Sequence, residues 1–184
     1  MKKLNILTYI AFALSVAVLL SGVSSSEAEE LNQRLTGTYS ISVVKTCYWD
    51  NGILNSIHLQ GEFTFDGNGN GWAEIYAFGV NIFHPNPSNI PGDLNQKVFD
   101  GIFTYTVGSN QYFIIDPLNL YVPDTNNLVV ENVSFEGWIG RGSQTLIISN
   151  TEGNIETVYN GNFPSGKMDR NCGGTGSAVK VSKE

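Results

Sequence analysis

Apolar and polar side chains alternate along most of this chain after residue 38, in runs that Gly, Asn, Asp and Pro interrupt about every ten residues. Because successive side chains of a strand point to opposite faces, this alternation predicts strands with one buried and one wet face. A helix would repeat its apolar residues every three or four positions, and that period is almost absent. The expected strands cover residues 39–49, 57–65, 72–80, 99–107, 111–115, 128–139, 144–149 and 155–159.

About eight strands with mostly short connections indicate an all-β fold, a single antiparallel up-and-down β-barrel that leaves no open sheet edge. A β-sandwich is the alternative. Two connections are expected to be long loops, the proline-rich residues 84–97 and residues 117–127. The last two expected strands form a hairpin through residues 150–154, and the chain ends in a polar tail.

The N-terminal region has the pattern of a signal peptide. Lys2 and Lys3 precede an apolar run over residues 10–23, and Ser26-Glu27-Ala28 supplies the small-x-small pattern of a cleavage site. The apolar run is shorter than the roughly 20 residues that span a bilayer. We therefore expect residues 1–28 to be removed, leaving residues 29–184 as one domain, secreted or periplasmic and without stable insertion into a membrane.

Charge and cysteine content narrow the function classes. Loss of Lys2, Lys3 and Glu27 would change the net charge from −7 to −8. A negative chain without a basic run repels nucleic acid, which is not an expected partner. The two cysteines, Cys47 and Cys172, are most simply a disulfide in an exported protein. A catalytic thiol is the alternative, but it needs a nearby base in a chain with only two histidines.

Three short motifs carry a resemblance to known proteins. They are Leu35-Thr36-Gly37-Thr38-Tyr39, the run Gly61 to Asn70 (GEFTFDGNGN) and Gly101 to Val107 (GIFTYTV). In these the chain resembles small, mostly uncharacterised secreted bacterial proteins of lipocalin-like or calycin-like β-barrel type, which implies the fold far more than a function. Gly37-Thr38-Tyr39 is also similar to the openings of lipocalins and avidins, with Tyr in place of Trp. The other motifs of those families are not evident, so neither ligand class is implied.

No motif assigns a catalytic residue, a metal or a cofactor. Asp66, Asn68 and Asn70 match the start of a calcium loop, but Ala77 stands where a closing Glu is needed, so a hairpin turn is favoured. His58 and His84 lack zinc-ligand spacing. The pair Glu152 and Glu156 is interpreted as part of turn chemistry, since nothing places two acids across a cleft.

Two charges nevertheless fall on expected core faces. Lys45 shares the apolar face of residues 39–49, and Glu131 that of residues 128–139. A charge there must be paired, reach water or line a cavity. A rim position or a β-bulge that flips the face is the plainer interpretation; the sharper hypothesis is that both line the mouth of a ligand cavity.

The candidate ligand-binding residues are Lys45, Glu131, Tyr105 and Trp72. Trp72 shares one face with Tyr76 and Phe78, an aromatic stripe that is more often core than a sugar-binding platform. The sequence does not decide which face of residues 72–80 is inside.

Three functions remain open. The first is non-enzymatic binding of a small apolar or amphipathic ligand inside the barrel. The second is a pocket-type isomerase or cyclase, with Glu131 as its titratable group. The third is an extracellular protein-interaction module that uses loops 84–97 and 117–127. An interior filled by its own aromatic residues would favour the third.

Overall fold

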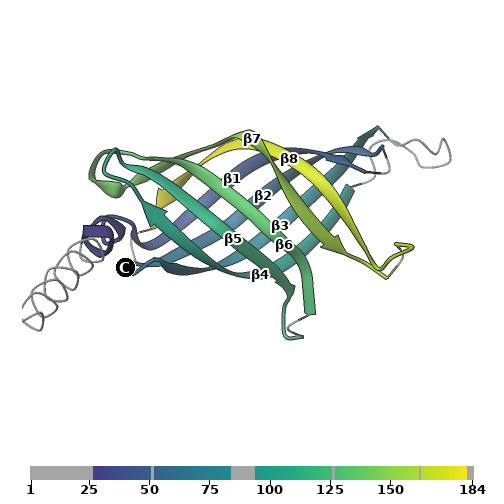
Figure 1. The fold of residues 1–184 in the computed structure, drawn as a ribbon, viewed down its shortest axis with the longest axis horizontal. Coiled ribbons are helices and arrows are strands. Elements are labelled where there is room, and N and C mark those ends of the chain that lie inside the picture. Colours follow the sequence, from purple (N-terminus) through teal and green to yellow (C-terminus); the bar gives the residue numbers. More distant parts are fainter. Residues whose placement is uncertain (1–26, 51, 84–93, 126, 162, 182–184) are drawn as a thin grey trace, which may run out of the picture.

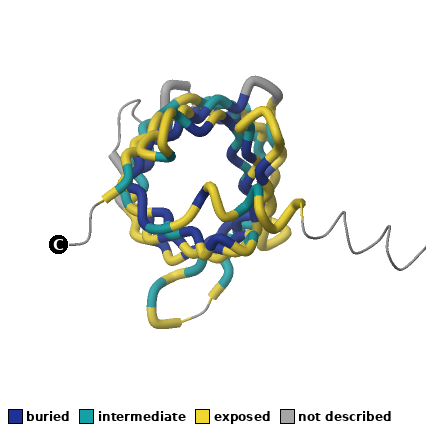
Figure 2. Tube along the Cα trace, turned by 90° about the vertical axis from the view of Figure 1, so that its left-hand side faces the viewer, coloured by how far each residue is buried: buried dark blue, intermediate teal, exposed yellow. Residues whose placement is uncertain are grey.

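Eight antiparallel strands close into one barrel in sequence order, and the last strand pairs back with the first (Figures 1 and 2). The computed structural model describes residues 27–50, 52–83, 94–125, 127–161 and 163–181. The predicted all-β barrel is confirmed, and the sandwich alternative is not adopted. Closure leaves none of the eight strands at an open sheet edge, which explains why the chain needs no second sheet.

The strands are long and joined mostly by short turns. They are β1 (Thr36–Trp49), β2 (Leu54–Asp66), β3 (Asn70–Phe83), β4 (Leu94–Val107), β5 (Tyr112–Val122), β6 (Asn127–Ile139), β7 (Thr145–Tyr159) and β8 (Lys167–Lys180). Residues 27–32 form a short helix, and η1 (Arg141–Ser143) is one 3-10 turn. Within the described ranges no helix has the length and apolarity to cross a membrane. The expected signal peptide lies outside the described residues except for positions 27 and 28.

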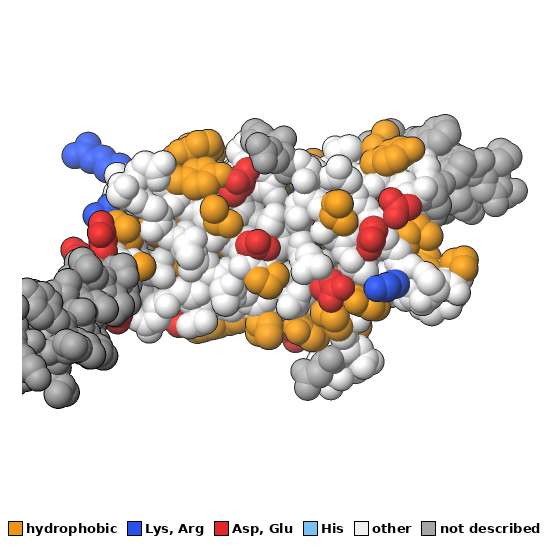
Figure 3. All heavy atoms as spheres, in the orientation of Figure 1, with side chains coloured by type: hydrophobic (Ala, Val, Ile, Leu, Met, Phe, Trp, Pro, Cys, Tyr) orange, Lys and Arg blue, Asp and Glu red, His pale blue; other side chains and the backbone are white. Residues whose placement is uncertain are grey.

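The interior of the barrel is apolar, as the alternation predicts. In β1 the residues Tyr39, Ile41, Val43, Lys45 and Cys47 are buried, while the residues between them face outward. The same pattern holds in β2 and β4, which place their Phe residues inside. Figure 3 shows the outer wall on one face, where hydrophobic side chains lie scattered among polar and acidic ones.

β3 turns its small residues inward and its aromatic residues outward. Ala73 and Ile75 are buried, whereas Trp72 is 56% exposed and Tyr76 38% exposed. The face of residues 72–80 that the sequence left undecided is thus the one with Ala73 and Ile75 inside, and the more usual core position of an aromatic stripe is not adopted by Trp72 and Tyr76. The reason is tertiary: a Cβ at Gly71 would lie 2.3 Å from the ring of Phe103, so the large rings of neighbouring strands already occupy the space in front of β3.

The C-terminal third differs from the predicted strand pattern in two ways. Two predicted strands are one strand, and one further strand was not predicted, so the total number of strands is unchanged. Residues 150–154 are not a turn, because β7 runs unbroken from Thr145 to Tyr159 with a register shift against β8 between Asn150 and Asn154. The eighth strand is instead β8, whose glycine-rich sequence carries little apolar alternation. A Cβ at Gly174 would lie 2.5 Å from the carbonyl oxygen of Val44, so β8 needs glycine to approach β1.

The two expected long loops are shorter than predicted. β4 already begins at Leu94, and β5 continues through Pro117 to Val122. Pro117 is tolerated because the pairing of β5 shifts register there against both neighbours, so its missing N–H interrupts no regular ladder. Residues 84–93, including His84, lie outside the described part of the chain.

Cys47 and Cys172 form the predicted disulfide across the seam where the barrel closes. They face each other in the β1–β8 register and are fully buried. Their bond joins residues 125 positions apart, the beginning and the end of the barrel wall.

Candidate functional site: a cavity in one half of the barrel

One half of the barrel interior contains a cluster of aromatic rings in contact with one another. The ring centre of Phe65 lies 5.5 Å from that of Tyr39, 5.3 Å from that of Phe103 and 5.0 Å from that of Tyr105. Phe63 contacts both Phe103 and Phe135 at 5.5 Å. Edge-to-face and tilted pairs at these distances leave little free volume.

The segment before β1 packs against this half at the end where β1 begins. Leu35 is fully buried, and its carbonyl oxygen accepts a hydrogen bond from the Tyr105 hydroxyl at 2.8 Å. The Asn32 Oδ1 accepts one from the backbone N–H of Val107 at 2.9 Å. Burial, followed by the neighbouring Tyr105, raises the pKa of Tyr39 to about 12, so this phenol stays neutral. We call this part of the interior the filled half. Its residues are Leu35, Tyr39, Phe63, Phe65, Phe103, Tyr105 and Phe135.

The opposite half contains a cavity of about 390 Å³. All eight strands contribute to its wall, each from the same end of the barrel, together with residues of two adjoining turns. The lining residues are Lys45, Trp49, Ile53, Asn55, Ile57, Leu59, Ala77, Gly79, Lys97, Phe99, Leu120, Val129, Val130, Val133, Glu156, Val158, Asn160, Phe163 and Arg170. Most of these side chains are apolar. We call this region the hollow half.

Three charged side chains from different strands meet in the wall of the cavity. Lys45 of β1 donates a hydrogen bond to Glu156 Oε1, and Arg170 of β8 donates to Glu156 Oε2 from Nε at 2.9 Å and from Nη2 at 2.7 Å. The side chains of Lys45 and Glu156 are 3% and 1% exposed, while that of Arg170 is 12% exposed. Arg170 is thus the member of this charged trio that reaches furthest toward open space.

Aromatic rings flank both cations of the charged trio. The Nζ of Lys45 lies 5.0 Å from the ring centre of Phe135, which also contacts Phe63 in the filled half. The guanidinium carbon of Arg170 lies 5.1 Å from the ring centre of Trp49. Rings at this distance stabilise a positive charge that has lost part of its hydration.

The electrostatics of the trio follow from its burial. Burial by itself raises the pKa of Glu156, but the charges of Lys45 and Arg170 and their hydrogen bonds outweigh it, so the pKa is held below its ordinary value. Burial lowers the pKa of Lys45; the Glu156 charge opposes that shift only in part, and Arg170 adds to it. Glu156 is therefore a carboxylate with no proton to give and little tendency to accept one.

Two polar atoms near the trio are buried without a hydrogen-bond partner among the described residues. They are the Nε1 of Trp49, a donor, and the Oδ1 of Asn55, an acceptor. Both residues line the cavity. A buried polar atom without a partner costs about 1–3 kcal/mol, so such atoms call for an explanation such as a ligand or an ordered water.

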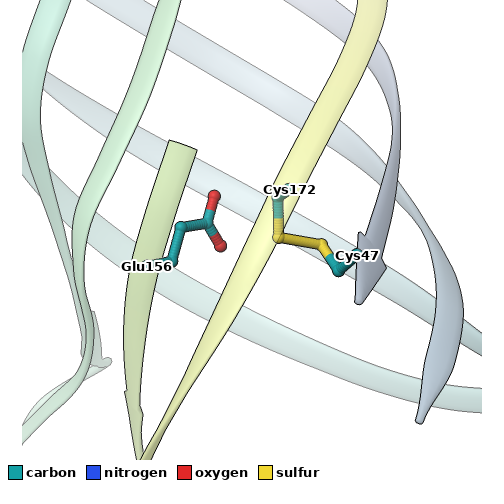
Figure 4. Close-up of side chains that lie close together, drawn as sticks. All are labelled: Cys47, Glu156 and Cys172. Carbon is teal, nitrogen blue, oxygen red and sulfur yellow. A yellow bond between two sulfur atoms is a disulfide. The ribbon is translucent and has the colours of Figure 1, made fainter. Parts of the chain in front are cut away.

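Glu156 also lies beside the disulfide (Figure 4). One ligand atom each from Cys47, Cys172 and Glu156 fall within 4.8 Å of one another, a spacing that a metal ion could use. Metal binding by cysteine requires thiolates, and the two sulfurs are bonded to each other instead. In the oxidised protein this group of residues is a structural junction of β1, β7 and β8.

The carboxylate of Asp66 is hydrogen-bonded within its own turn. The Asp66 carboxylate accepts bonds from the backbone N–H groups of Asn68 at 2.7 Å and Asn70 at 2.9 Å, and from the Asn70 side chain. Burial opposes ionisation, but these bonds outweigh it and lower the pKa of Asp66. The geometry is that of the hairpin turn joining β2 and β3.

The structure separates the four candidate ligand-binding residues. Lys45 lines the cavity, but Glu131 is not among the lining residues and accepts a hydrogen bond from the Tyr159 hydroxyl at 2.7 Å. Asn132, with φ 60°, marks a bulge after which the inward face of β6 changes. Tyr105 belongs to the filled half, and Trp72 lies on the outer wall.

Sequence reasoning missed Glu156 and Arg170, the partners of Lys45. The interpretation of Glu156 as a turn residue is wrong, because it lies inside β7 and is fully buried. A signal was available: a lysine on a core face requires a buried anion, and the chain offers few acids within apolar runs. Such a search finds Glu156 in Ile155–Tyr159, but only the register of β7 against β8 shows that it faces inward.

Comparisons with known proteins add little. No protein-family model matches the chain, and no curated protein matches it. Two solved structures of the enduracididine biosynthesis enzyme MppR align with it at 11% identity over 82% of its length. The one with HEPES buffer bound has a TM-score of 0.23 over 88% of that chain. The complex with the condensation product of pyruvate and imidazole 4-carboxaldehyde has 0.22 over 90%. Alignments at this level support no inference about this chain.

Proposed function

We propose that this protein is a non-enzymatic binding protein that holds one small apolar or amphipathic molecule in the hollow half of its barrel. The observation that carries the proposal is the cavity of about 390 Å³ among the lining residues. Ligand pockets commonly measure about 300–1,000 Å³, and a dry cavity of about 150 Å³ already binds benzene. The interior thus has room for a ligand, although its other half is filled.

The composition of the wall supports an apolar ligand body with a polar group at one place. Side chains such as Ile57, Leu59, Phe99 and Val133 cover most of the surface, whereas the charged trio and the two unpartnered atoms come from the adjacent strands β7, β8, β1 and β2. Apolar walls with a few placed polar groups are typical of binding pockets for small molecules.

Export is part of the proposal. Disulfides persist in oxidising compartments, and the Cys47–Cys172 bond agrees with the leader expected over residues 1–28. A ligand carrier outside the cytoplasm would benefit from a covalent link between the first and last strands.

The enzymatic alternative loses its titratable group. Glu131 is not among the residues that line the cavity, and Glu156, which does line it, is held ionised by two cations. A general base needs a pKa near the working pH, so a carboxylate with a lowered pKa is a weak base. The interaction-module alternative relies on loops 84–97 and 117–127. Residues 84–93 and 126 lie outside the described residues, and residues 94–97 and 117–122 belong to strands β4 and β5.

Native mass spectrometry and a neutral fluorescent probe test the proposal. The purified protein should enhance the fluorescence of 1-N-phenylnaphthylamine at one site per molecule. Ala77→Trp should weaken this binding at least tenfold by occupying part of the cavity, since Ala77 lines it. The matched control is Trp72→Ala on the outer side of the same strand, which should bind the probe normally. Absence of binding to the folded protein, or equal binding by Ala77→Trp, contradicts the proposal.

A further inference from the structure

We infer that the ligand of this cavity carries a single anionic oxygen group, a carboxylate on an apolar body, and that Arg170 and Trp49 bind this group. The inference rests on the proposed function and adds a chemical class to it. Two independent observations support it: the charge balance of the cavity wall, and the kind of hydrogen-bonding atom that the wall leaves without a partner.

The wall has more positive than negative charge. Lys45 and Arg170 share one carboxylate, that of Glu156, and the further charged lining residue, Lys97, is also basic. The protein as a whole has the opposite balance, with a net charge of −7. A positive site buried in an acidic protein stays uncompensated unless an anion enters. Burial is the main cause of the lowered pKa of Lys45, and the nearby charge of Arg170 lowers it further.

The atoms near the trio point to an acceptor on the ligand. The Trp49 Nε1–H is a buried donor without a partner among the described residues, and Trp49 is the ring beside the Arg170 guanidinium. Arg170 donates hydrogen bonds to Glu156 from Nε and Nη2. Because a guanidinium has five N–H groups in all, others remain for a ligand. Its side chain is also the most exposed of the trio. An oxygen placed between Trp49 and Arg170 would accept from both.

A carboxylate fits this arrangement better than other groups do. An ammonium would add a third cation to the trio, and a neutral hydroxyl would leave the excess charge in place. The charged trio by itself has one positive charge in excess, because Lys97 lies on β4 and not beside the trio. This single excess charge matches that of a carboxylate, whereas a phosphate monoester carries nearly two near neutral pH. Asn55 Oδ1 is an acceptor and would take a hydroxyl or amide N–H elsewhere on the ligand body.

Displacement of the neutral probe by three matched ten-carbon ligands tests the inference on the full-length protein. Decanoate, decanol and decylamine differ at one end only, so each measures the preference of the wall for an anion, a neutral group or a cation. We expect decanoate to bind at least tenfold more tightly than decanol, and decylamine to bind worst. Equal or tighter binding of decanol or decylamine overturns the inference but leaves the proposed function standing. If the probe and all three ligands fail to bind, the proposed function fails.

Variants of Arg170 and Trp49 test whether these residues cause the preference for decanoate. Arg170→Met should reduce decanoate binding at least tenfold and leave decanol binding within about twofold. Trp49→Phe keeps a ring and removes the N–H, and should weaken decanoate severalfold without changing decanol. Lys167→Met is the control, since it removes a positive charge from the same strand at an exposed position. If Arg170→Met does not fold, the Trp49→Phe variant and the binding of the three ligands to the unmodified protein still test the inference. A decanoate preference that survives Trp49→Phe and Arg170→Met alike contradicts the assignment.

Discussion

The two halves of this barrel share the same strands and differ in what those strands place inside. In the filled half, Phe63, Phe65 and Phe103 meet ring against ring, and Leu35 packs at that end. In the hollow half, the same strands place Leu59, Ala77 and Phe99 around a cavity of about 390 Å³. One half secures the fold by close packing, and the other gives up packing and so has space for a ligand.

The position of the charged trio follows the same division. Lys45, Glu156 and Arg170 all line the cavity of the hollow half, and Lys45 lies over the ring of Phe135. Buried ion pairs are weak contributors to stability, because desolvation costs about as much as the attraction returns. Their presence beside the cavity, and not within the aromatic cluster, associates them with the site.

The largest expected effect on stability comes from removing the disulfide that links β1 and β8 in the hollow half. Replacing both Cys47 and Cys172 by Ala releases a loop of 125 residues, worth roughly 4–5 kcal/mol in the chain-entropy model. Hydrogen exchange should rise more in β1 near Cys47 than near Tyr39, because ring packing continues to hold the filled half. A uniform rise along β1 would show that the two halves open together and would contradict the comparison.

Phenylalanine truncation compares the two halves directly. Phe63→Ala should cost about 4 kcal/mol of unfolding free energy, because it opens a hole in a filled aromatic cluster. Phe99→Ala should cost about 2 kcal/mol, because it enlarges an existing cavity and loses fewer contacts. Urea unfolding of both variants measures the difference, and equal losses would mean that the halves are equally packed.

Removal of the buried carboxylate tests the trio. Glu156→Gln leaves Lys45 and Arg170 without a counter-charge and should cost about 3 kcal/mol at neutral pH. Glu62→Gln, an exposed carboxylate on the outer wall, is the matched control and should change stability little.

The same variant has a pH signature. Because the pKa of Glu156 is lowered by folding, its contribution to stability is present above the ordinary value of 4.5 and is lost as the pH falls through the folded-state pKa. The Glu156→Gln protein should therefore lose less stability than the parent between neutral and acid pH. Parallel stability curves for the two proteins would contradict the lowered pKa.

The smallest effects come from two alanines on the inner face of β3. Ala77→Leu in the hollow half should change unfolding free energy by less than about 0.5 kcal/mol, since the cavity accepts the side chain, and should weaken probe binding. Ala73→Leu in the filled half should cost about 1–3 kcal/mol by overpacking and leave binding intact. Thermal melts and probe titrations of both variants provide the measurement, and the reverse result would exchange the roles of the two halves.

Local sequence predicted the strands that bury alternate large residues and missed the one that does not. β1, β2 and β4 were found because Tyr39, Phe63 and Phe103 alternate with polar residues. β8 was missed because its inward positions include glycine, which carries no hydrophobic signal. The wrong turn at residues 150–154 arose because Gly and Asn resemble a hairpin, although in β7 they accommodate a register shift.

The site was predictable only in part, for the same reason. Lys45 on an apolar strand face was enough to indicate a pair or a cavity, and both are present. Its proposed companion Glu131 sits at the bulge in β6, where an inserted residue changes which side chains face inward.

By itself the sequence determined the all-β class, the up-and-down barrel and the Cys47–Cys172 bond, because side-chain alternation and cysteine pairing are local or nearly unambiguous signals. The tertiary structure alone decided which face of β3 is inside, which half is hollow, and that Glu156 and Arg170 join Lys45. These features depend on strand register and barrel closure, which bring together residues 111 positions apart and which a single shift would reverse.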